Sequence, residues 1–126
     1  MSYTITFMPD TKILKTVFEG NVKKGEVDEV MVKNLEMAKQ YQTTLFLVDC
    51  TKIEDESSFV LENYETGILL TKISKEMPGR LKDALILPRS PKAAENLRFF
   101  ETVTRNRGMS VRSFENEEDA IAWLLS

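Results

Sequence analysis

The chain has 126 residues, a net charge of −3 and a hydrophobic share of 42%, which is the composition of an ordinary globular domain. This weakly acidic balance gives no general attraction to nucleic acid or to an anionic membrane. Without histidine and with only one cysteine, the chain excludes an internal disulfide, the usual zinc sites and catalytic pairs that need histidine.

The N-terminal residues predict an antiparallel β-hairpin. Apolar residues alternate with threonines over residues 3–7, and a second alternating run covers residues 13–18. Between the two runs, Pro9 and Asp10 supply residues that are favoured in tight turns.

The period of the apolar residues then changes to that of a helix over residues 25–41, with one stripe from Val27 to Tyr41. Residues 43–50 (TTLFLVDC) form a continuous apolar run that is rich in β-branched and aromatic residues. Such a run predicts a strand that is buried on both faces.

A second helix is expected from Ser57 or Ser58 to about Ile73, followed by a short buried strand, DALILP, at residues 83–88. The third helix has the clearest boundaries, because Ser90 is a favoured N-cap and Gly108 suits a left-handed C-terminal residue. Its inner stripe is expected to contain the apolar or small residues Ala93, Leu97, Phe100 and Thr104, widened by Phe99 and Val103.

A last strand at residues 109–114 and a helix capped by Asn116 complete the order β-β-α-β-α-β-α-β-α. Strands that alternate with helices predict an α/β fold whose sheet is mostly parallel beyond the first hairpin. We therefore expect one domain over residues 1–126, with a mixed five-stranded sheet and about four helices.

Three segments resemble the STAS-domain, SpoIIAA-like proteins: FEG at the end of the second strand, LVDCTKI at the third, and VRSFENEEDAIAWL near the C-terminus. The resemblance covers nearly the whole chain and implies a STAS-like fold without catalysis. It also implies a regulatory or binding role, most simply the binding of another protein. Members of the family bind partner proteins, nucleotides or lipids.

The resemblance further implies a phosphorylation site at Ser57 or Ser58, as in a phosphoserine-switched anti-sigma-factor antagonist. The chain departs from that pattern, since Phe59 replaces the usual glycine and the preceding loop TKIEDE is acidic. Phosphate adds about −1.5 to −2 charge, which these carboxylates would repel. The alternative interpretation is that the serines only cap the second helix.

A candidate rim for a partner or ligand consists of Asp49, Thr51, Phe59, Arg89 and Ser90. Asp49 is expected to end a parallel strand, and ligands of α/β sheets bind at the carboxyl ends of strands. In the alternative interpretation, Asp49 bonds to amides of its own loop and fixes a turn.

Two further groups have a functional and a structural interpretation. Between Arg89 and Arg112 the chain has six basic residues and two acidic ones. These basic residues form either a patch for an anionic partner or a solvated helix face. Phe59, Tyr64 and Gly67, with Phe99 and Phe100, line an apolar pocket for a small or lipid-like ligand, or are simply core.

Several absences complete these expectations. No apolar run approaches the roughly 20 residues that span a bilayer, and the first residues lack the basic flank of a signal peptide. We expect a cytoplasmic protein without a transmembrane segment, metal, cofactor or nucleic-acid partner. Cys50 is expected to be a small core residue, and the edge of the first hairpin allows a homodimer.

Overall fold

The computed structural model describes residues 3–54, 68–77 and 79–126, and these form an α/β fold. Residues 68–74 are helical and precede β4. The other elements, in chain order, are β1 (Tyr3–Met8), β2 (Ile13–Gly20), α1 (Lys24–Tyr41), β3 (Leu45–Ile53), β4 (Lys82–Ile86), α3 (Pro91–Asn106), β5 (Ser110–Phe114) and α4 (Glu117–Leu124).

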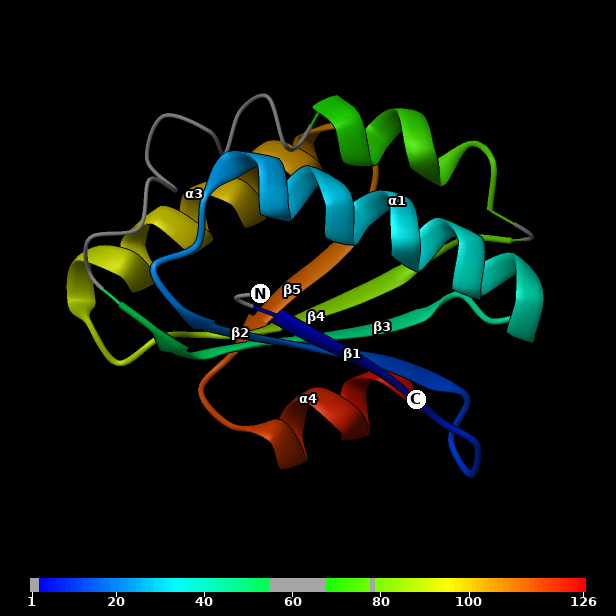
Figure 1. Cartoon of the computed structure of the whole chain (residues 1–126), viewed down its shortest axis with the longest axis horizontal. Coiled ribbons are helices and arrows are strands. Elements are labelled where there is room, and N and C mark those ends of the chain that lie inside the picture. The colour runs from blue at the N-terminus through cyan, green and yellow to red at the C-terminus, as the bar shows by residue number, and fades with distance from the viewer. Residues whose placement is uncertain (1–2, 55–67, 78) are drawn as a thin grey trace.

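The five strands form one mixed sheet in the order β1-β2-β3-β4-β5. β1 is antiparallel to β2, and the remaining neighbours are parallel. The helices α1 and α3 and the helical residues 68–74 cover one face, and α4 covers the other (Figure 1). The mixed sheet and the predicted element order are therefore confirmed for the described residues.

The predicted antiparallel hairpin is confirmed, with Tyr3 opposite Phe18 and Met8 opposite Ile13. Its turn closes through a hydrogen bond of 2.8 Å from the Lys12 amide to the Met8 carbonyl. Lys12 has φ +60°, a left-handed conformation that costs a non-glycine residue some free energy. The Thr43 hydroxyl donates to the Lys12 carbonyl and so holds this residue from outside the turn.

Two hydrophobic cores lie on the two faces of the sheet. The larger one, under α1, α3 and residues 68–74, contains Leu14, Phe46, Leu85 and Leu97. The smaller one, under α4, is built by a different set of residues: Ile13, Leu47, Ala84, Ile86, Ala120 and Leu124. Because side chains alternate along a strand, each of β2, β3 and β4 supplies residues to both cores.

The predicted ends of α3 and the predicted start of α4 are confirmed. The Ser90 hydroxyl accepts from the Ala93 amide at the start of α3, and Gly108 beyond its end has φ +82°. The Asn116 side chain accepts from the Asp119 amide at 2.8 Å. These bonds satisfy amide groups that the first turn of a helix leaves without a partner.

Two expectations about the elements are wrong in detail. β3 runs to Ile53 rather than Cys50, because Lys52 and Ile53 pair with Glu19 and Gly20 beyond a register shift. Phe99 does not widen the inner stripe of α3 but is 52% exposed. The predicted stripe itself, from Ala93 to Thr104, is buried.

Two neighbouring leucines at the end of α4 differ in burial. Leu124 is buried in the small core, whereas its neighbour Leu125 is half exposed. We expect Leu124→Ala to lower the free energy of unfolding by about 2–5 kcal/mol and Leu125→Ala to change it by less than about 0.5 kcal/mol. Urea unfolding followed by the fluorescence of Trp123 measures both; equal effects would contradict this packing.

Candidate functional site

An apolar pocket lies inside the larger core, between the central strands and the helices above them. Its volume is about 70 Å³, and its lining comes from β2, β3, β4, α1, α3 and residues 68–77. Met31 and Met77 take part in the lining, and their flexible side chains adapt to ligands of different shape. A pocket of this volume has room for a few water molecules or one small organic group.

Two polar side chains interrupt this apolar lining. Asp83 on β4 is 7% exposed and Asn34 on α1 is 9% exposed. The Asn34 side-chain nitrogen donates to the Thr16 hydroxyl at 3.3 Å, which leaves its oxygen free. Neither Asp83 Oδ1 nor Asn34 Oδ1 has a hydrogen-bond partner. The pocket is thus lined mainly by apolar side chains, and two of its lining residues carry a buried hydrogen-bond acceptor without a partner.

Burial changes the acid–base properties of Asp83. Desolvation raises its pKa from the ordinary carboxyl value to about 7, since the charged form loses its hydration and gains no compensating group. Near neutral pH this carboxyl is therefore present in both its neutral and its ionised form.

Cys50 lines the same pocket from β3 and is buried. Desolvation, and then the nearby carboxylates of Asp49 and Asp83, raise the pKa of its thiol far above the ordinary value. The thiol therefore stays protonated, and a protonated thiol is a poor nucleophile. The prediction that Cys50 is a small core residue is confirmed.

Sequence reasoning did not select Asp83 or Asn34, although both left a signal. Asp83 is the one charged residue within the apolar run 83–88 that was predicted as a buried strand. Asn34 follows Val30 by four positions and Val27 by seven, so it falls on the predicted apolar stripe of the first helix. Asp83 and Asn34 can both be identified as polar residues at positions where the sequence pattern predicts a buried apolar residue.

The structure gives Asp49 a local role. Its carboxylate accepts from the Thr51 amide at 2.9 Å and from the Thr51 hydroxyl at 2.7 Å. This amide lies where the register of β2 and β3 shifts, between the Val17 pair and the Glu19 pair. Asp49 thus supplies a partner to a backbone group at a bulge, on the face of the sheet opposite the pocket.

The remaining rim residues have a mixed outcome. Arg89 and Ser90 follow β4, so they lie at the same edge of the sheet as the end of β3. Arg89 is exposed, and the Ser90 hydroxyl caps α3. The predicted residues Ser57, Ser58 and Phe59 lie outside the described residues.

The apolar pocket expected from the sequence overlaps the observed one in Phe100. Phe99 was wrongly assigned to it, because α3 turns this side chain outward. Tyr64 and Gly67 lie outside the described part of the chain. The observed lining comes mainly from strands and from α1, which the prediction did not include.

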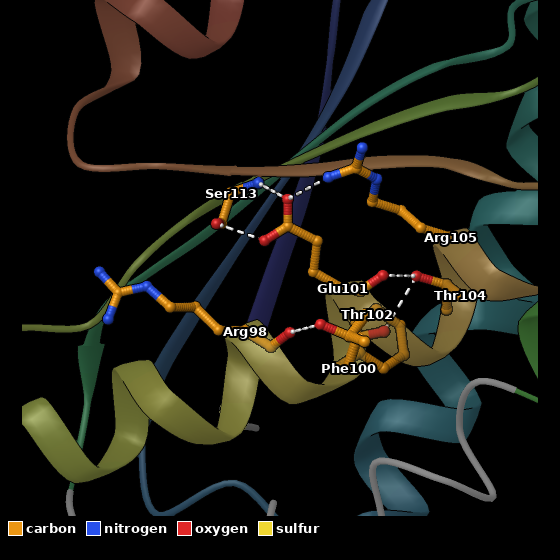
Figure 2. Close-up of polar contacts among 7 residues, drawn as sticks. All are labelled: Arg98, Phe100, Glu101, Thr102, Thr104, Arg105 and Ser113. Atoms are coloured by element: carbon orange, nitrogen blue, oxygen red, sulfur yellow. Dashed lines mark hydrogen bonds and ion pairs between the residues drawn. The ribbon is translucent and has the colours of Figure 1, made fainter.

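The basic surface of α3 is organised around Glu101, as Figure 2 shows. Glu101 accepts from the Ser113 amide at 3.1 Å and the Ser113 hydroxyl at 2.7 Å, and Arg105 lies 3.9 Å away. Arg98 lies on the other side of Glu101 (Figure 2), and the residues enclose an open groove of about 520 Å³. The carboxylate pairs with Arg105 and connects α3 to the edge strand β5.

In comparisons with known proteins, no family model, curated protein or solved structure matches this chain. None of the described helices is long and apolar enough to cross a membrane. Within residues 3–54, 68–77 and 79–126, no three acidic or cysteine side chains form a group that could hold a metal ion.

Asp83 makes the stability depend on pH. Its folded pKa of about 7 exceeds the unfolded value of about 3.9, so folding retains a proton that unfolding releases. The stabilising contribution is present below about pH 4 and is lost as pH rises to about 7, a loss of up to about 4 kcal/mol.

We expect Asp83→Asn to remove this dependence and to be more stable than the wild type at about pH 8, with a smaller advantage at about pH 5. Chemical unfolding across this pH range is the measurement. Asp10→Asn, in the exposed turn after β1, is the matched control. A wild type and Asp83→Asn variant whose stabilities change in parallel with pH would contradict the burial of an ionisable Asp83.

The Glu101 contacts predict a coupled loss of stability. Glu101→Gln removes charge-assisted bonds to Ser113 and should lower the free energy of unfolding by about 1–3 kcal/mol. Glu95→Gln, on an exposed part of the same helix, is the control and should have little effect. A double-mutant cycle with Ser113→Ala measures the coupling between Glu101 and the Ser113 hydroxyl; additive effects would show that this hydroxyl does not help to connect α3 to β5.

Proposed function

We propose that this chain is a non-catalytic binding module of the STAS (SpoIIAA-like) type, and that its ligand is a small, largely apolar molecule. The ligand occupies the pocket between the sheet and the helices α1, α3 and 68–74. Its apolar part contacts residues such as Phe46, Leu70 and Phe100, which all line the pocket.

The observation that carries this proposal is the pair of buried acceptors without partners, Asp83 Oδ1 and Asn34 Oδ1. A buried polar group without a hydrogen bond costs about 1–3 kcal/mol, and most such groups in proteins have a partner. Both residues line the same pocket, so an occupant toward which their side chains rotate can supply the missing hydrogen bonds.

The chemistry of the lining supports binding without catalysis. The Cys50 thiol stays protonated because burial and neighbouring carboxylates raise its pKa. Asp83 has a perturbed pKa of the kind found at functional sites, yet no nucleophile or cationic side chain lines the described part of the pocket beside it. Such a pocket recognises a molecule and offers little to transform it.

The STAS-like part of the proposal is supported by the element order and by the mixed sheet, whose first hairpin is antiparallel. Binding of another protein, and a phosphoserine switch at Ser57 or Ser58, remain predictions from the resemblance. We favour ligand binding over these two alternatives because the described residues include an apolar pocket and its unpaired acceptors, whereas Ser57 and Ser58 lie outside them.

The test uses xenon, an apolar probe that enters dry protein cavities. Val30 lines the pocket and is 3% exposed, whereas Val32 on the same helix is 47% exposed. We expect xenon to shift the methyl NMR signals of Met31 and Met77. Val30→Leu, which adds a methylene group to the lining, should weaken this binding severalfold, and Val32→Leu should not.

Native mass spectrometry of gently purified protein supplies an independent measurement, in which a bound small mass is lost on denaturation. Absence of both the xenon shifts and any bound mass would contradict the proposed function. Equal xenon binding by the Val30→Leu and Val32→Leu variants would place the probe elsewhere and would contradict the assigned pocket.

A further inference from the structure

Both polar groups of the pocket are hydrogen-bond acceptors. The Asn34 nitrogen donates to the Thr16 hydroxyl, and in this orientation the amide oxygen has no partner. Asp83 contributes a carboxyl group whose Oδ1 has no donor. An occupant that satisfies the Asn34 oxygen and the ionised form of Asp83 must donate hydrogen bonds to them.

The rest of the lining strengthens this requirement. No lysine or arginine lines the pocket among the described residues, and α1 and α3 present only uncharged side chains to it. Cys50 is the other titratable group of the lining, and its thiol stays protonated. A ligand carboxylate or phosphate would face the Asp83 charge without a compensating cation, so anionic ligands are disfavoured.

The two acceptors approach the pocket from different elements. Asp83 on β4 pairs with Phe46, and Thr16 on β2, which holds Asn34, pairs with Val48. Asp83 is therefore carried by the strand on one side of β3, and Asn34 is held by the strand on its other side. A hydroxyl group has one proton to donate, whereas a primary ammonium group has three and also carries the charge that compensates Asp83.

We propose that the pocket selects small primary amines, bound as ammonium ions whose N–H groups donate to the Asp83 carboxylate and the Asn34 amide oxygen. This inference rests on the proposed function, because it assigns the polar end of the same ligand. The apolar end would be short and branched, since about 70 Å³ is roughly half the volume of a cavity that accepts benzene.

Proton balance makes the binding depend on pH. Below about pH 7 Asp83 holds a proton, so an ammonium ion binds with release of that proton to the solvent. Above that pH the carboxylate is already formed, and the ammonium ion binds without proton release. Asp49 on β3, whose charge also acts on Cys50, points to the opposite face of the sheet and therefore does not face the bound ammonium group.

The experiment titrates the protein with isopropylamine, isopropanol and acetate, which match one another in size and branching, and follows the methyl NMR signals of Met31 and Met77. At about pH 8 we expect isopropylamine to bind about tenfold more tightly than isopropanol, and acetate not to bind. Between about pH 5.5 and pH 8 the amine affinity should rise roughly thirtyfold, as the ionised fraction of Asp83 does.

Asp83→Asn should lose the preference for the amine and its pH dependence while it still binds isopropanol, and Asp10→Asn should retain both. Equal affinity for amine and alcohol, or tighter binding of acetate, would overturn the inference and leave the apolar pocket intact if xenon still binds. Failure of xenon and all three probes would overturn the proposed function itself. The pH dependence of the wild type decides the question even if Asp83→Asn does not fold.

Discussion

The burial of the Asp83 carboxyl group, without a hydrogen-bond donor for Oδ1, is the constraint on which the chemistry of this molecule depends. β4 is a central strand that is covered on both faces, so every side chain it carries must be compatible with an apolar environment. Desolvation of Asp83 lowers stability near neutral pH, and the rest of the sheet must offset that cost. A ligand with a donor group would relieve it.

Lys82, the residue before Asp83 on β4, is a charged residue that does have partners. Lys82 points to the other face, where its Nζ donates to the Trp123 carbonyl at 3.0 Å and lies 5.1 Å from the Trp123 ring centre. This contact helps to fix α4 against the small core. The fold thus supplies partners to Lys82 but none to Oδ1 of Asp83 one position later, and this difference is the reason that we place the proposed ligand on the Asp83 face.

Much of the fold could be predicted from the sequence because local signals agree with one another. The alternation over residues 3–7 and 13–18 determines the hairpin, and Ser90, Gly108 and Asn116 mark helix ends with residues that suit those backbone positions. The end of β3 could not be predicted, because it depends on pairing with Gly20 across a bulge rather than on its own residues. Phe99 was misplaced for a similar reason: an apolar residue beside a buried stripe carries no signal of the direction in which it points.

The candidate site was less predictable than the fold. Its polar groups come from α1 and β4, which are far apart in the sequence, and only the sheet order β2-β3-β4 brings them to one pocket. Asp49 attracted the functional interpretation because it stands where an apolar run changes to polar residues, yet its carboxylate is used by Thr51 at the bulge. Asp83 and Asn34 interrupt apolar patterns instead, and that signal gains meaning only when the pattern is known to be buried.

The most direct test of this account is the titration of the Asp83 carboxyl carbon by NMR in the wild-type protein. A buried Asp83 without a donor should titrate with a midpoint near pH 7, well above that of an exposed aspartate. A midpoint near pH 4 would mean that Asp83 is hydrated or paired, and it would contradict the unsatisfied carboxyl on which the proposed binding site depends.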